Sequence, residues 1–165
     1  MIKLESFDNK FLKATYDWLQ DSKLKKKFFL RKEITWQNHL TWFDSYKSDS
    51  SQKMFAILDN QTHCGNCGFK NINTIDEKAE MWIYLGNEKF QGKGLASNAL
   101  KALLNYGFSE MKLNKIYLHV DEFNKKAIAL YEKHKFNIEG YFINEIKIEE
   151  KYLSIYRMYL LKSLY

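Results

Sequence analysis

The chain has 165 residues, enough for one domain with its own hydrophobic core, and we expect a single domain over residues 1–165. Apolar residues make up 45% and charged residues 28%, spread along the sequence, which excludes a disordered polyelectrolyte. No apolar run approaches the roughly 20 residues of a membrane span. The N-terminal "MIKLESFDNK" also lacks the apolar segment of a signal peptide, so a cytoplasmic location is expected.

The formal net charge of +6 favours anionic partners in general. The densest basic run, from Lys23 to Lys32, suits either a polyanion-binding patch or a solvated helix face or loop. The sequence has neither zinc-finger spacing nor an RNA-binding signature. We therefore expect neither nucleic acid nor a membrane as the partner.

Cys64 and Cys67 form a C-x-x-C pattern in "THCGNCGFKNI". A redox pair of this type normally opens a helix, whereas glycines and a strand-like segment follow here. A zinc site needs two further ligands, and His63 alone does not complete one. We expect structural free cysteines and no metal.

Helical spacing of apolar residues predicts two helices in the first third of the chain, from Asn9 to Gln20 and from an N-cap at Thr35. The basic run between them is expected to be a loop or a short irregular helix. Three strand-like segments then follow with short turns between them, which favours antiparallel pairing. They are "KMFAILD", "HCGNCGFKNIN" and "KAEMWIYL".

A loop containing Gly92 and Gly94 leads into an amphipathic helix predicted from Leu95 to Met111. A strand from Lys115 to Val120, a helix opened by Asn124, and two final strands complete the pattern. Because the two strands around the Leu95 helix are joined through it, they should pair in parallel. The predicted fold class is α+β, a mixed sheet with helices on its faces.

The loop between the third strand and this helix has the properties of an anion site. Its glycines and the free N–H groups of the helix N-terminus can cradle phosphate oxygens, and Lys89 and Lys93 can add Coulomb attraction. A tight strand-to-helix turn is the alternative. "GNEKFQGKG" lacks the hydroxyl of the nucleotide P-loop and the last glycine of the dinucleotide fingerprint, which disfavours ATP and NAD.

The segment "QGKGLA", Gln91 to Ala96, resembles the acyl-coenzyme A loop of the GNAT superfamily of N-acetyltransferases. The flanking "EMWIYLGNEKFQGKGLASNAL" resembles the fourth strand, loop and helix of that family, and "LHVDEFNKKAIALYEKHKF" its next strand and helix. Lys135 departs from the pattern, because the family usually has glycine before Phe136. The resemblance implies a mostly antiparallel sheet that splays between two parallel strands, flanked by helices on both faces.

The resemblance also implies acetyl-CoA as co-substrate and a set of contacts to it. Backbone pairing with the pantetheine arm is implied for Ile83 and Leu85, and a contact to its amide for Asn124. The residues implied at the pyrophosphate are Gln91, Gly92, Lys93, Gly94, Leu95 and Ala96.

Tyr131 is implied near the thioester sulfur as the general acid, because a tyrosine hydroxyl stays protonated at neutral pH. Its alternative role is a core aromatic. Two residues compete for the general base: His119, in the middle of "YLHV", and Glu80, at the start of the preceding parallel strand. His134 is expected at a helix C-terminus, where it interacts with the helix dipole.

The segment from Arg31 to Asn73 resembles the subgroup that acts on nucleotide-linked amino sugars in surface-glycan pathways, and more loosely the subgroup that acetylates N-termini of ribosomal proteins. We predict transfer of an acetyl group to a small amine acceptor of the first kind, with Trp36 and His39 as substrate contacts. The alternatives are acetylation of a protein N-terminus and a non-enzymatic polyanion-binding module. The chain is compatible with a homodimer.

Overall fold

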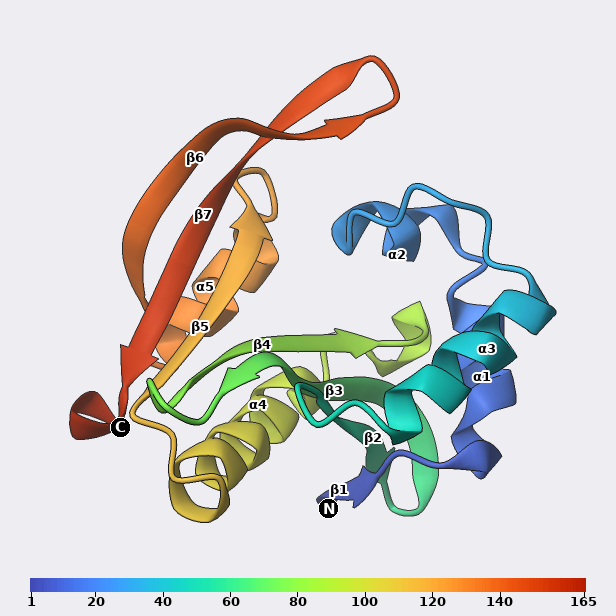
Figure 1. The fold of residues 1–165 in the computed structure, drawn as a ribbon, viewed down its shortest axis with the longest axis horizontal. Coiled ribbons are helices and arrows are strands. Elements are labelled where there is room, and N and C mark those ends of the chain that lie inside the picture. The colour runs from blue at the N-terminus through green and yellow to red at the C-terminus, as the bar shows by residue number, and fades with distance from the viewer.

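A seven-stranded sheet runs through the whole computed structural model, which describes residues 1–165 (Figure 1). Its strand order is β1-β2-β3-β4-β5-β7-β6. The strands are β1 (Ile2–Ser6), β2 (Lys53–Asp59), β3 (Thr62–Asn73), β4 (Lys78–Leu85), β5 (Lys115–Asp121), β6 (Asn137–Ile148) and β7 (Lys151–Leu161). All of them were predicted except β1, a short edge strand that pairs with β2.

Five α-helices accompany the sheet. They are α1 (Leu12–Trp18), α2 (Ser22–Lys27), α3 (Trp36–Lys47), α4 (Leu95–Asn105) and α5 (Lys125–Lys133). Thr35 caps α3 as predicted, since its side chain accepts a hydrogen bond from the N–H of Asn38. The predicted Leu95 helix is α4 followed by a π-helical turn, Tyr106–Glu110. No helix combines the length and apolarity that crossing a membrane requires.

The strands pair antiparallel except for β4 and β5, which run parallel. Their parallel register covers only three pairs and ends with Glu80 opposite Tyr117. Beyond that pair the two strands diverge, and β4 keeps only β3 as a neighbour. The predicted mixed sheet, splayed between two parallel strands, is confirmed.

Two hydrophobic cores lie on opposite faces of the sheet. Because side chains alternate along a strand, β2 sends Phe55 and Ile57 into the larger core and Met54, Ala56 and Leu58 into the smaller. The larger core includes Leu100, Leu103 and Leu104 of α4, all fully buried. Each contributes about 2 kcal/mol of transfer free energy, so packing holds α4 on the sheet. Helices α1 and α3 cover the smaller core through Leu12 and Phe43.

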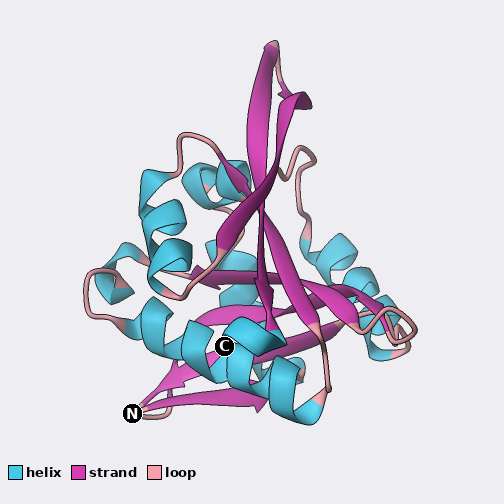
Figure 2. Ribbon diagram, turned by 90° about the vertical axis from the view of Figure 1, so that its left-hand side faces the viewer, coloured by secondary structure: helices cyan, strands magenta, loops and turns pink.

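The hairpin β6–β7 projects well beyond the body of the domain (Figure 2). Across from it, α2 lies near the diverging end of β4, on the far side of the opening between β4 and β5 (Figure 1). These two features stand on either side of the place where the sheet parts.

Candidate active site

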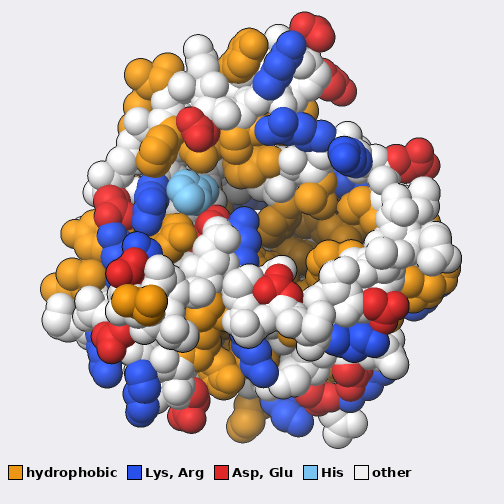
Figure 3. Space-filling model, viewed as in Figure 1, with side chains coloured by type: hydrophobic (Ala, Val, Ile, Leu, Met, Phe, Trp, Pro, Cys, Tyr) orange, Lys and Arg blue, Asp and Glu red, His pale blue; other side chains and the backbone are white.

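A cavity of about 920 Å³ occupies the opening between β4 and β5. Its walls come from α2, from β4 between Glu80 and Leu85, from the start of α4, from β5 and α5, and from the β6–β7 hairpin. In Figure 3 a hollow with hydrophobic side chains at its base is visible, and Lys or Arg side chains stand at its edge. The cavity therefore joins the glycine loop to the region beneath α2.

The glycine loop at one end of the cavity has the geometry of an anion cradle. Gly92 and Gly94 both have φ of 74°, the left-handed region that favours glycine. Gly94 is the N-cap of α4 and supplies no side-chain cap. The first helical N–H bonded to a backbone carbonyl is that of Asn98, which donates to Gly94 O at 3.1 Å. The preceding N–H groups stay available, so the loop fits the pyrophosphate of coenzyme A.

Five of the six loop residues predicted at the pyrophosphate line the cavity: Gln91, Gly92, Gly94, Leu95 and Ala96. Lys93 does not line it and is exposed. The role that remains for Lys93 is to attract phosphate by its positive charge at the edge of the cavity.

The edge of β4 that faces the cavity has unpaired backbone groups. Ile83 and Leu85 pair with Cys67 and Gly65 of β3 on one side, while no strand pairs with them on the other. An extended ligand can hydrogen-bond to that edge as an added strand does. The two residues line the cavity, where the resemblance put the pantetheine arm.

Tyr131 and Asn124, both of which line the cavity, belong to the last helix. Tyr131 is buried, packs its ring against Phe136 with centroids 5.8 Å apart, and has its pKa raised by burial to about 12. It remains a proton donor at neutral pH. Asn124 is the N-cap of α5, where its Oδ1 accepts a hydrogen bond from Ala127 N at 3.3 Å. Its capping role leaves the amide nitrogen for a ligand.

The two base candidates are in contact with each other. Nδ1 of His119 lies 3.0 Å from Oε1 of Glu80, and both side chains line the cavity. The parallel register of β4 and β5 brings them together, because Glu80 stands opposite Tyr117, two residues before His119.

An aromatic wall, formed by Phe28, Phe29, Trp82 and Tyr84, lines the cavity near α2. Trp82 and Tyr84 stack with centroids 6.0 Å apart, and Phe28 meets Tyr84 edge-on at 5.2 Å. The sequence analysis did not identify Trp82 and Tyr84 as site residues. The available signal was the aromatic pair in "EMWIYL", which alternates with Ile83 and Leu85, the residues implied at the pantetheine arm.

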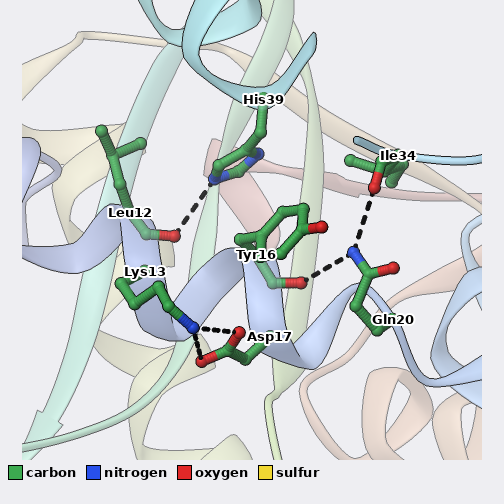
Figure 4. A network of polar contacts seen from close by, with 7 residues as sticks. All are labelled: Leu12, Lys13, Tyr16, Asp17, Gln20, Ile34 and His39. Carbon is green, nitrogen blue, oxygen red and sulfur yellow. Dashed lines mark hydrogen bonds and ion pairs between the residues drawn. The ribbon is translucent and has the colours of Figure 1, made fainter. Parts of the chain in front are cut away.

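Trp36 and His39 lie away from the cavity, although we predicted them as substrate contacts. His39 is buried between α3 and α1, and its Nε2 lies 3.2 Å from the carbonyl oxygen of Leu12 (Figure 4). Its ring stacks on Trp42, and Trp36 packs edge-on against Tyr16. Both residues join α3 to α1, which is a structural role.

His134 is the C-cap of α5, as predicted, and also contacts the cofactor loop region. Its Nε2 lies 2.8 Å from Oγ of Ser97 in the first turn of α4. Burial, with Lys133 and Lys101 nearby, lowers the pKa of His134. A neutral ring therefore links α5 to α4.

Cys64 and Cys67 are both free and buried in the larger core. Sγ of Cys64 donates to the carbonyl oxygen of Ile57 at 3.3 Å. Burial raises the pKa of both thiols, which keeps them protonated and unreactive.

Comparisons with known proteins agree with this geometry. The chain is 35% identical to spermidine N(1)-acetyltransferase of Escherichia coli over 123 residues, 74% of this chain and 66% of that protein. It is 27% identical to acetyltransferase PseH of Campylobacter jejuni over 141 residues, 84% of this chain and 86% of that protein. The chain thus spans about two thirds of the length of the E. coli relative.

The fold matches a crystal structure of spermidine N-acetyltransferase from Vibrio cholerae in complex with CoA and spermine. The TM-score is 0.94 at 27% identity, over 99% of this chain and 96% of that one. Another structure of the V. cholerae enzyme is dodecameric. The family description "Acetyltransferase (GNAT) domain" matches residues 2–137. As the loop motif predicted, the chain belongs to the GNAT family of acetyltransferases.

Proposed function

We propose that the chain transfers an acetyl group from acetyl-CoA to the primary amine of an anionic small molecule, with a nucleotide-linked amino sugar as the best fit. The observation that carries the proposal is the cavity, which has a phosphate cradle at one end and a basic, aromatic acceptor region at the other. Acetyl-CoA supplies an acyl group activated as a thioester.

On the donor side, the chain positions the reactants and manages one proton. The N–H groups of the Gly92–Gly94 loop bind the pyrophosphate, and the free edge of β4 at Ile83 and Leu85 aligns the pantetheine arm. The N–H near Leu85 polarises the thioester carbonyl. Tyr131 donates its proton to the departing sulfur, which its raised pKa allows at neutral pH.

On the acceptor side, the positive charge of α2 favours an anion. Its sequence "SKLKKK" carries lysines on successive turns, and Lys27 lines the cavity without an ion-pair partner. Lys70 also lines the cavity but is paired there with Glu80 at 3.3 Å. The aromatic wall beside Lys27 can stack on a planar base, while Lys27 and the other lysines of α2 attract a diphosphate.

Spermidine is the second candidate, because the structural match with the V. cholerae spermidine enzyme covers nearly the whole chain. A polyamine needs unpaired carboxylates near its several positive charges. Three carboxylates and three lysines line this cavity. Glu80 is paired with Lys70 and His119, which leaves Asp121 and Glu145 for a polycation. The basic run of α2 at the cavity wall is the feature that favours the anionic acceptor.

An acceptor panel with a thiol-release readout tests the proposal. The panel contains a UDP- or dTDP-linked amino sugar, the same amino sugar without its nucleotide, spermidine, and a peptide with a free N-terminus. We expect the highest kcat/KM for the nucleotide-linked sugar. A higher value for spermidine or for the peptide would overturn the assignment of the acceptor and leave the family assignment unchanged.

Lys27→Ala, with Lys26→Ala as its matched control, tests the role of α2. Both lysines belong to the same helix, but only Lys27 lines the cavity. We expect Lys27→Ala to raise KM several-fold for the nucleotide-linked sugar, and added salt to mimic this by screening. The KM of the sugar without nucleotide should not change. Equal effects of the two substitutions would contradict a local contact.

A further inference from the structure

Both oxygens of the Glu80 carboxylate are engaged by hydrogen-bond donors or cations. Oε1 lies 3.0 Å from Nδ1 of His119 and 3.3 Å from Nζ of Lys70, and Oε2 accepts from Nδ2 of Asn71 at 2.8 Å. The residue is only 8% exposed. Burial alone would raise its pKa, but His119 and Lys70 outweigh burial and lower it. A carboxylate held in this way stays ionised and is a weak proton acceptor.

A distortion of the backbone places one of these donors. Asn71 has φ of 51°, in the left-handed region, where the register of β3 against β4 shifts between Lys70 and Asn73. This irregularity turns the Asn71 side chain toward Glu80. Asparagine tolerates the left-handed region better than other non-glycine residues, so the irregularity is accommodated locally.

His119 has one nitrogen engaged and the other unengaged. Its Nδ1 faces the ionised Glu80, which favours the tautomer with the proton on Nδ1 and leaves the lone pair on Nε2. Nε2 makes no hydrogen bond within the chain, and the side chain is 26% exposed at the cavity. The rings of Tyr117 and Phe142 lie edge-on to the imidazole, with centroids 5.9 and 6.0 Å away, and restrict its rotation.

We propose that Nε2 of His119 is the general base that takes the proton from the acceptor ammonium, and that Glu80 is a positioning residue that fixes the tautomer. This inference rests on the proposed acetyl transfer, whichever amine is the acceptor. The Glu80 carboxylate also stabilises the imidazolium that forms, because the two groups are already in contact. Lys70 and Asn71 hold the carboxylate in place.

The proton and electron balance of the transfer assigns one role to each residue. His119 takes one proton from the ammonium, and this leaves a lone pair on the amine nitrogen. His119 then passes the proton to solvent. That pair forms the C–N bond as the C–S bond breaks, with the bonding electrons going to sulfur. Tyr131 protonates the sulfur and recovers a proton from the same nitrogen through solvent. An ammonium and a thioester thus give an amide, a thiol and one released proton.

His119→Asn and Glu80→Gln separate the two roles. In His119→Asn the amide nitrogen replaces Nδ1 as the donor to Glu80 but has no basic lone pair, so kcat should fall about 100-fold or more. Glu80→Gln removes the charge and keeps the volume, so we expect a smaller fall of about 10-fold. It should also shift the acidic limb of the kcat/KM profile to lower pH, because the imidazolium loses its anionic partner.

The other titratable and charged groups near His119 are the same in the wild type and in both variants. Comparing the kcat/KM profiles of the three proteins with one acceptor therefore assigns the acidic limb to the imidazole of His119. These groups are Lys70 of β3, Tyr117 and Asp121 of β5, Lys126 of α5, Glu145 of β6, and Arg157 of β7, which pairs with Glu139. Glu110→Gln is the control, since Glu110 is exposed and outside the cavity. Its kcat and profile should match those of the wild type.

The affinity for acetyl-CoA and the melting temperature are measured for every variant, so that misfolding is recognised. A wild-type protein that acetylates no amine of the panel would contradict the proposed function itself. With an active wild type, retention of both rate and acidic limb in His119→Asn would overturn this inference. A larger loss in Glu80→Gln than in His119→Asn, with the limb abolished, would also overturn it and make Glu80 the base.

Discussion

The amide of Asn66 donates a hydrogen bond of 2.8 Å to the hydroxyl of Tyr84, across the adjacent strands β3 and β4. The same amide nitrogen donates to Oγ1 of Thr15 at 2.8 Å, and Oδ1 of Asn66 contacts Nε2 of His63 at 2.8 Å. Asn66 is fully buried. One side chain therefore joins β3 and β4 to α1 directly behind the aromatic wall.

Asn66→Ala should destabilise the domain by about 2 to 3 kcal/mol, because it leaves buried polar partners unsatisfied. Urea unfolding followed by circular dichroism measures this, and KM for the acceptor should rise as Tyr84 loses its anchor. Asn105→Ala, at an exposed position of α4, should change stability by less than about 0.5 kcal/mol. Equal effects would contradict the structural role of the network.

Gly94→Val should weaken acetyl-CoA binding at least about 10-fold in a domain that still folds. A Cβ at Gly94 meets no atom within 4 Å, so packing does not forbid it. The φ of 74°, however, is a strong outlier for a β-branched residue, and the loop must rearrange. Calorimetric titration measures the affinity, and Gly94→Ala should have an intermediate effect. Wild-type affinity in a folded Val variant would remove the phosphate role of the loop.

Tyr131→Phe should lower kcat by about 10- to 100-fold and leave the affinity for acetyl-CoA within a few-fold of the wild type. Phenylalanine keeps the packing against Phe136 and removes only the proton donor. Steady-state kinetics combined with calorimetry distinguish the two effects. A fully active variant would reduce Tyr131 to a packing residue.

Lys135→Gly should stabilise the domain by about 0.5 to 1 kcal/mol. Lys135 has φ of 66°, so a lysine occupies a left-handed position that costs a non-glycine residue about 1 kcal/mol. The turn at the end of α5 is maintained by hydrogen bonds from Lys135 N and Phe136 N to the carbonyl oxygens of Glu132 and Tyr131. Chemical denaturation tests this expectation, and a destabilised variant would show that the lysine side chain contributes more than the strain costs.

The free energy of unfolding should fall as the pH drops below about 6.5. His39, His63 and His134 all have their pKa lowered, chiefly by burial. Below the pKa of the unfolded chain these groups bind more protons when unfolded, so acid favours unfolding. Denaturant titrations at pH 7.5, 6.5 and 5.5 measure the slope, which His39→Gln should reduce. A stability that is constant over this range would contradict the burial of these rings.

The parts of the molecule that the sequence predicted well are specified locally. The Gly92–Gly94 loop depends on backbone angles that glycine permits, and the caps at Thr35 and Asn124 act within four residues of themselves. The turn at Lys135 was not predicted, because lysine there departs from the family pattern; the structure keeps the turn with a left-handed lysine and two local hydrogen bonds.

The parts that the sequence could not specify depend on contacts between distant segments. His39 lies on the face of α3 that meets α1, and only the packing of these helices decides that it faces the core and not the cavity. The contact between Glu80 and His119 needs the register of the β4–β5 pair, and that of Asn71 needs an irregularity in β3. From the residue types alone, Glu80 and His119 were alternative candidates for the general base. In the structure the two side chains are 3.0 Å apart and form one hydrogen-bonded pair.

The early end of the β4–β5 pairing has a thermodynamic consequence for the protein as a whole. A ligand that lies along the open edge of β4 supplies hydrogen bonds that no part of the chain provides, and it binds the folded state alone. Free donor at a concentration 100 times its Kd would add about 2.7 kcal/mol to the free energy of unfolding. The resistance of this domain to unfolding is therefore linked to the supply of its own substrate.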